Sequence, residues 1–90
     1  MSCRIDRSVD GNHVIILRVS GRITGEYVVI LRELLEKESG MTAIDLKDVL
    51  LIDRKAVKLL SRCEISGTEL RNCPAYIREW VTRETNSWTG

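Results

Sequence analysis

The chain has few of the residues that usually mark a catalytic site. It has one histidine, His13, and no serine, cysteine or second histidine close to it in sequence completes a nucleophile and base pair. We expect His13 to be a half-exposed strand residue that follows a turn. There is no Walker-type phosphate loop, since Gly21, Gly25 and Gly40 are spaced as turn and cap residues. The sequence therefore predicts a protein that is not an enzyme.

The three cysteines, Cys3, Cys63 and Cys73, lack the close pairing of a redox dithiol or a structural zinc site. We expect them to be small, mostly buried apolar residues of a reducing compartment. An intermolecular disulfide through Cys3 on oxidation in vitro is the alternative.

Neither net charge nor apolar run length points to a nucleic acid or a bilayer. Fourteen basic and thirteen acidic residues give a formal net charge of +1, too little to recruit an anionic polymer or surface at long range. No apolar run approaches the roughly 20 residues that span a bilayer, and the first residues lack the parts of a secretion signal. We expect a cytoplasmic protein that binds no nucleic acid and does not insert into a membrane.

Aromatic residues are scarce, and there is no phenylalanine. Tyr76, Trp80 and Trp88 stand near arginines and suggest a stacking platform for nucleic acid. Because the rest of the chain has no basic excess, we favour core packing for Trp80. Tyr76 and Trp88 are predicted to belong to an exposed apolar patch.

What the chain does have is the composition of one soluble domain. It has 90 residues, 43% hydrophobic and 30% charged, and a chain this short has material for only one core. We expect the domain to cover residues 3–85 and residues 86–90 to fray.

Strand and helix patterns alternate along the chain, which predicts an α/β fold with a mixed, partly parallel sheet of about four strands and three main helices. The first strand alternates as an edge strand does, and the second is apolar at nearly every position, as if covered on both faces. We expect Thr24 to cap the first helix and Ile77, Trp80 and Val81 to face inward from the last. The predicted elements are strands at 3–9 and 13–20, a helix at 26–38, a strand at 42–46, a helix at 54–64, a strand at 68–71 and a helix from Pro74.

The most informative segment runs from Ala43 to Val57 and predicts a buried strand, a loop and an aspartate that opens a helix. Asp45 is expected to end the strand, Asp48 to belong to the turn and Asp53 to cap the helix, a cap that contributes ~1 kcal/mol. Their spacing does not match a calcium loop, so we predict no metal site and no cofactor.

In this order the elements resemble the STAS family, the sulphate-transporter and anti-sigma-factor-antagonist domain. In that family the aspartate opens the motif Asp-Ser-Ser-Gly-Leu, and in its antagonists the serine after the aspartate is phosphorylated by a partner kinase. Here Arg54, Lys55 and Ala56 replace the two serines and the glycine, so Arg54 is a degenerate phosphosite. The segments that carry the resemblance are Val14 to Gly21, Ile44-Asp45-Leu46 with Val49 and Ile52-Asp53, and Leu70 to Ala75.

Arg54 and Lys55 are unfavourable at a helix N-terminus, which carries partial positive charge. They are either solvated side chains or cations set to meet an acidic surface on a partner. The resemblance implies a non-catalytic regulatory module that docks through the Asp53 loop and the following helix, as a monomer or homodimer. The predicted partner-binding residues are Asp53, Arg54, Lys55, Val57 and Lys58.

The resemblance leaves two partners open. The first is a kinase-like anti-sigma factor or another signalling protein. The alternative is the ATPase of a lipid-trafficking ABC transporter, on which small STAS subunits pack through the same helix.

Overall fold

The structure, a computed structural model, describes residues 3–89, and the side chains of residues 3–87. It contains a four-stranded sheet and three helices, as predicted. The elements are β1 (Cys3–Val9), β2 (Ile15–Ile23), α1 (Glu26–Lys37), β3 (Thr42–Ile52), α2 (Arg54–Ile65), β4 (Glu69–Arg71) and α3 (Ala75–Thr89).

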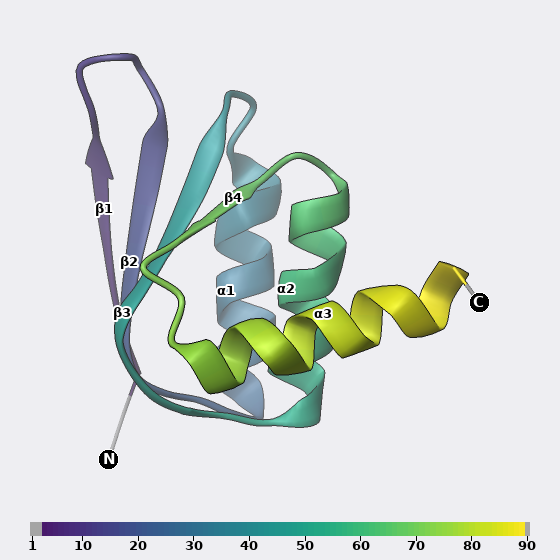
Figure 1. Cartoon of the computed structure of the whole chain (residues 1–90). Coiled ribbons are helices and arrows are strands. Elements are labelled where there is room, and N and C mark those ends of the chain that lie inside the picture. The colour runs from purple at the N-terminus through teal and green to yellow at the C-terminus, as the bar shows by residue number, and fades with distance from the viewer. Residues whose placement is uncertain (1–2, 90) are drawn as a thin grey trace.

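The strands lie in the order β1-β2-β3-β4. β1 pairs with β2 antiparallel, whereas β2 with β3 and β3 with β4 are parallel pairs. The sheet is therefore mixed and partly parallel, with β1 at one edge, as the sequence predicted. Both parallel connections carry a helix, and Figure 1 shows α1 and α2 side by side on the same face of the sheet.

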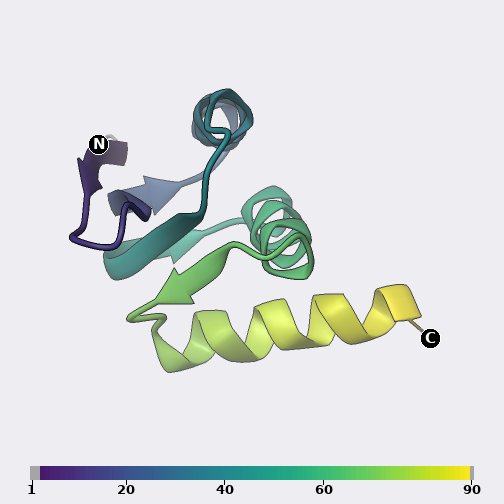
Figure 2. The same cartoon turned by 90° about the horizontal axis from the view of Figure 1, so that it is seen from above.

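The core lies between this face and the helices. Seen from above, α1 and α2 cover one face, α3 runs past the β4 edge beneath α2, and the opposite face carries no helix (Figure 2). Buried side chains from all three helices and the two central strands form one cluster. Its members are Leu17, Val19, Ile23, Val28, Leu31, Ile44, Leu46, Val49, Ile52, Ala56, Val57, Leu60, Ile77 and Val81.

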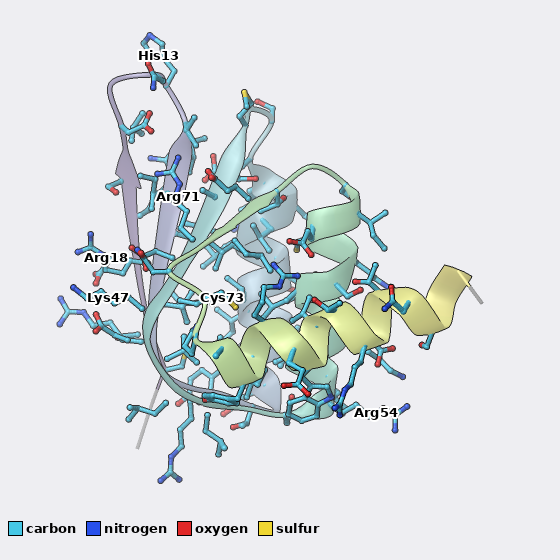
Figure 3. The ribbon with its side chains drawn as sticks, in the orientation of Figure 1. His13, Arg18, Lys47, Arg54, Arg71 and Cys73 are labelled. Atoms are coloured by element: carbon cyan, nitrogen blue, oxygen red, sulfur yellow. The ribbon has the colours of Figure 1, made fainter. Side chains whose placement is uncertain are left out.

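The prediction that the second strand is covered on both faces was wrong. Leu17 and Val19 are buried under the helices, but the Arg18 side chain between them is 61% exposed. Figure 3 shows Arg18 on the open side of the sheet. The apolar run suggested two covered faces because Ile16 is apolar, but Ile16 lies on this same open face and is only half-buried.

β2 and β3 are both longer than predicted. β2 continues through Gly21, where the sequence indicated a turn, and β3 continues from Leu46 to Ile52. Register shifts occur between Arg18 and Ser20 and between Gly21 and Arg22. Gly21 has a φ of 87°, which glycine adopts without strain, so the chain bulges but stays paired.

Two carboxylates were consequently misplaced by the sequence. Asp45 and Asp48 both lie within β3, so Asp45 does not end the strand and Asp48 does not belong to a turn. Asp45 is buried, and its Oδ1 accepts hydrogen bonds from the backbone N–H of Lys47 (3.0 Å) and from Nδ2 of Asn72 (3.3 Å). These hydrogen bonds offset the cost of removing the carboxylate from water.

The predicted helix ends also needed correction. α1 has Gly25 as its N-cap, with no side-chain cap bond, so the expectation for Thr24 was wrong. α3 runs to Thr89, beyond the domain boundary predicted at residue 85. The assignment of 3–85 as the domain and of 86–90 as a fraying tail stays a prediction.

Candidate functional site

The N-terminus of α2 is fixed by Asp53, as the sequence predicted. Asp53 has extended backbone (φ −104°, ψ 179°), and its Oδ1 accepts a hydrogen bond from the N–H of Ala56 at 2.9 Å. The Asp53 carbonyl accepts from Val57 N–H at 3.1 Å and closes the first turn. The side chain thus satisfies one of the donors that a helix start leaves unpaired.

Asp53 also joins the starts of the two helices. Its Oδ2 accepts from the backbone N–H of Gly25, the N-cap of α1, at 2.9 Å, and its own N–H donates to Ile23 O at 3.3 Å. Gly25 N–H thereby receives the acceptor that a capping box would supply from within its own helix. Because both carboxylate oxygens are engaged, Asp53 positions the loop.

The cations predicted for partner binding project from this fixed start. Arg54, Lys55 and Lys58 are all exposed. Within the described part of the chain, none of the three forms an ion pair with a carboxylate. Figure 3 shows Arg54 near the start of α2 and Lys47 on the opposite side of the molecule.

Val57 does not share this surface. Its side chain is fully buried in the core cluster, so the structure separates it from the other four predicted residues. The sequence placed it with them because it follows Lys55 closely along the chain. A helix turns by about 100° per residue, so close neighbours in sequence can face opposite ways.

Exposed apolar residues beside the loop were missed by the sequence analysis. Leu50 is 74% exposed and Leu51 47%, although consecutive strand residues normally face opposite sides of a sheet. In the register, Gly21 pairs with Val49 and Arg22 with Leu51, so the shift leaves Leu50 without a partner residue in β2. No pattern in the sequence predicts this shift.

The C-terminal helix contributes a further exposed aromatic surface next to Leu50. The Tyr76 hydroxyl donates to Leu50 O at 2.9 Å, and the side chain is half exposed, as predicted. Trp80 is 37% exposed, so the prediction that it packs in the core was wrong. Trp88 lies outside the residues whose side chains are described.

Other candidate groups lie apart from this loop. His13 is exposed in the β1–β2 turn with a φ of 64°, not in a strand as predicted. In the described residues, no group of three or more His, Cys, Asp or Glu side chains is arranged to hold a metal ion. No helix there is both long and apolar enough to cross a membrane.

The three cysteines are free thiols and only partly buried. Burial raises the pKa of Cys63 to about 11, and that of Cys3 and Cys73 above the ordinary value. They are therefore less reactive than exposed thiols at neutral pH.

Comparison with known proteins gives a structural relationship. No protein-family profile and no curated protein sequence matches the chain. Ten chains of solved structures match. One is the anti-sigma factor antagonist SpoIIAA in its unphosphorylated form, with a TM-score of 0.65 and 16% identity over 84% of this chain and 79% of that one.

A second match is the STAS domain of an anti-sigma-factor antagonist from Rhodobacter sphaeroides. It has a TM-score of 0.51 and 15% identity, over 77% of this chain and 83% of that one. At such low identity the relationship is one of architecture. The chain has the STAS-like α/β fold of anti-sigma factor antagonists, as the sequence resemblance implied.

Proposed function

We propose that this protein is a non-catalytic regulatory module that binds another protein through the start of α2, without a phosphorylation switch there. The docking face consists of Arg54, Lys55 and Lys58, held in place by Asp53. The observation that carries the proposal is that these cations are exposed and form no ion pair within residues 3–87, on a helix start whose geometry is fixed.

Local stability gives no reason for this arrangement. A helix N-terminus disfavours cations by some tenths of a kcal/mol. Other basic residues of the chain do find partners: Arg7 pairs with Glu38 at 2.8 Å and Arg78 with Glu64 at 2.6 Å. Cations that remain unpaired on a fixed surface are suited to an acidic partner surface, where they add specificity and association rate.

The absence of a switch follows from the residue that occupies the position. Arg54 has no hydroxyl to phosphorylate, and its charge is opposite in sign to that of a phosphate. Contact through this loop is therefore constitutive. The fold shared with anti-sigma factor antagonists supports a kinase-like anti-sigma factor or another signalling protein as the partner, acting in the cytoplasm.

The test is affinity capture from the native cell, with identification by mass spectrometry. The wild type is compared with Arg54→Glu and with Lys47→Glu, a control that makes a comparable charge reversal on the opposite side of the molecule (Figure 3). We expect Arg54→Glu to lose the captured partner and Lys47→Glu to keep it, with the wild-type affinity falling as salt increases.

Three outcomes distinguish the alternatives. Capture of a kinase-like protein, lost in Arg54→Glu, supports the proposal, and Arg54→Ser with Lys55→Ser then asks whether a hydroxyl after Asp53 becomes a phosphate acceptor. Capture of a transporter ATPase supports the alternative partner. Equal capture by wild type and Arg54→Glu removes Arg54 from the interface.

A further inference from the structure

A groove runs between α1 and α2, next to the proposed docking face. The helices lie side by side with their N-termini at the same end, where Asp53 bonds to Gly25 N–H (Figure 1). The first half of the groove has a volume of about 390 Å³. A second hollow continues it toward the helix C-termini, sharing Arg32, Leu59 and Arg62 as lining residues.

The floor of the groove is apolar and its rim is cationic. Val28, Val29 and Leu59 supply the apolar lining of the first half. Val28 is 9% exposed and lies deep, whereas Val29 is 43% exposed. Four cations complete the lining of this half, to which no carboxylate contributes: Arg32 from α1 and Lys55, Lys58 and Arg62 from α2. The second half has one carboxylate in its lining, Glu36.

The cations on α2 follow the spacing of one helix face. Lys55, Lys58 and Arg62 stand at positions i, i+3 and i+7, with Leu59 beside them, so all four face α1. Like charges three apart on a helix are unfavourable, and Arg32 adds a fourth cation from across the groove. The whole chain has a net charge of only +1, so this concentration is local.

We propose that this groove binds an acidic amphipathic helix of the partner protein. Apolar side chains of that helix would cover Val28, Val29 and Leu59, and its Asp and Glu side chains would pair with Arg32, Lys55 and Lys58. This mode is the usual one for a helix in a hydrophobic groove, with anchors at helical spacing. The inference rests on the proposed docking function and names the chemistry of the partner.

The shape of the groove favours a helix over other anionic occupants. α1 and α2 have 12 residues each, so the groove is long enough for roughly three helical turns, about 18 Å. A small ligand would remain largely in water beside the exposed Val29, whereas ligand sites usually bury most of their ligand. A flat bilayer would touch the rim and leave Val28 on the floor uncovered.

The first test uses a designed peptide and needs no natural partner. The probe is a helical peptide with Leu at positions i, i+3, i+4 and i+7 and Glu at the others, titrated into isotope-labelled protein and followed by NMR. We expect shift changes at Val28, Val29 and Leu59. Lys58→Glu replaces an attraction by a repulsion and should weaken binding roughly tenfold, whereas Lys47→Glu should leave it unchanged.

Controls make the outcome decisive. The same peptide with Lys in place of Glu should not bind, and thermal melts must show that Lys58→Glu is as folded as Lys47→Glu. No binding of the acidic peptide at millimolar concentration overturns the proposal. Shift changes outside the groove overturn it as well. So does binding to phosphatidylserine vesicles when the peptide fails to bind, because a membrane would then be the better occupant.

A second comparison separates this inference from the proposed function. Arg54 belongs to the docking face but does not line the groove, whereas Arg32 lines the groove from α1. Loss of the natural partner in both Arg54→Glu and Arg32→Glu supports the docking face and the groove. If only Arg54→Glu loses the partner, the docking face stands and the groove proposal falls.

Discussion

Replacing Asp53 by alanine tests whether one carboxylate holds the starts of both helices. The substitution removes two hydrogen bonds of 2.9 Å, from Ala56 N–H in α2 and from Gly25 N–H at α1. Loss of an aspartate N-cap costs ~1 kcal/mol. The bond to Gly25 is more exposed, and water replaces part of it, so we assign it the lower end of the usual range, ~0.5–1 kcal/mol.

The sum is a loss of roughly 1.5–2 kcal/mol in the free energy of unfolding. For a domain of this size, each kcal/mol shifts the melting temperature by about 4–8 °C, so Asp53→Ala should melt roughly 6–16 °C lower. Asp53→Asn keeps one acceptor oxygen and should lose about half as much. Urea denaturation and calorimetry measure both variants.

Asp48→Ala is the matched control, since Asp48 is exposed in β3 and its side chain forms no hydrogen bond among those described. Hydrogen exchange adds a local readout, because the amides of Gly25 and Ala56 should both lose protection in Asp53→Ala. If Asp53→Ala and Asp48→Ala unfold at the same urea concentration, the two bonds contribute nothing and the reasoning is refuted.

Three further predictions concern the packing of α2. Arg78 donates two hydrogen bonds to Glu64, and these lower the pKa of Glu64. The pair therefore stabilises the protein fully at pH values above the ordinary glutamate pKa of about 4.3. This contribution is lost as the pH falls through the lowered pKa of Glu64 in the folded protein. Glu64→Gln should therefore destabilise the protein at pH 7, with a difference that shrinks in acid; a constant difference in pH-dependent urea melts would contradict this. Ser61 is fully buried, and its hydroxyl lies 2.8 Å from that of Thr85. Ser61 is the donor, because the Thr85 hydroxyl donates its own hydrogen to the Val81 carbonyl. Ser61→Ala should therefore lower the free energy of unfolding by about 1 kcal/mol in urea titrations, and an unchanged midpoint would exclude the bond. Cys63 should be the slowest thiol to react with iodoacetamide at pH 7.5, because its pKa is raised to about 11; peptide mapping showing it labelled first would be the contrary result.

The element order and the helix cap were accessible from sequence because both depend on local patterns. Asp53 caps a residue three positions away, and the apolar spacing of α2 marks Ala56 and Leu60 as core residues without reference to the rest of the chain. The four cations of the docking face and groove rim on α2 are equally visible in sequence. Their location on the surface follows from the same helical periodicity.

Strand length and side-chain exposure were decided by pairing between distant segments. β2 continues past Gly21 and β3 past Leu46 because each gives the other a partner for its backbone groups, and the register shifts between them expose Leu50 and Leu51. An apolar run indicates a strand but not how many of its faces a helix will cover. Arg18 is exposed between two buried neighbours because no helix within residues 3–89 covers its face of the sheet.

Sequence therefore determined which residues form the helices and that Asp53 begins α2. Only the tertiary structure brought Asp53 against Gly25, 28 positions earlier, and placed Arg32 across a groove from Lys58. The physical reason is that capping and amphipathicity act over a few residues, whereas the spacing of α1 and α2 is set by the sheet on which both pack. The loop that lacks a phosphorylatable serine is thus part of a larger surface that no single segment of the chain contains.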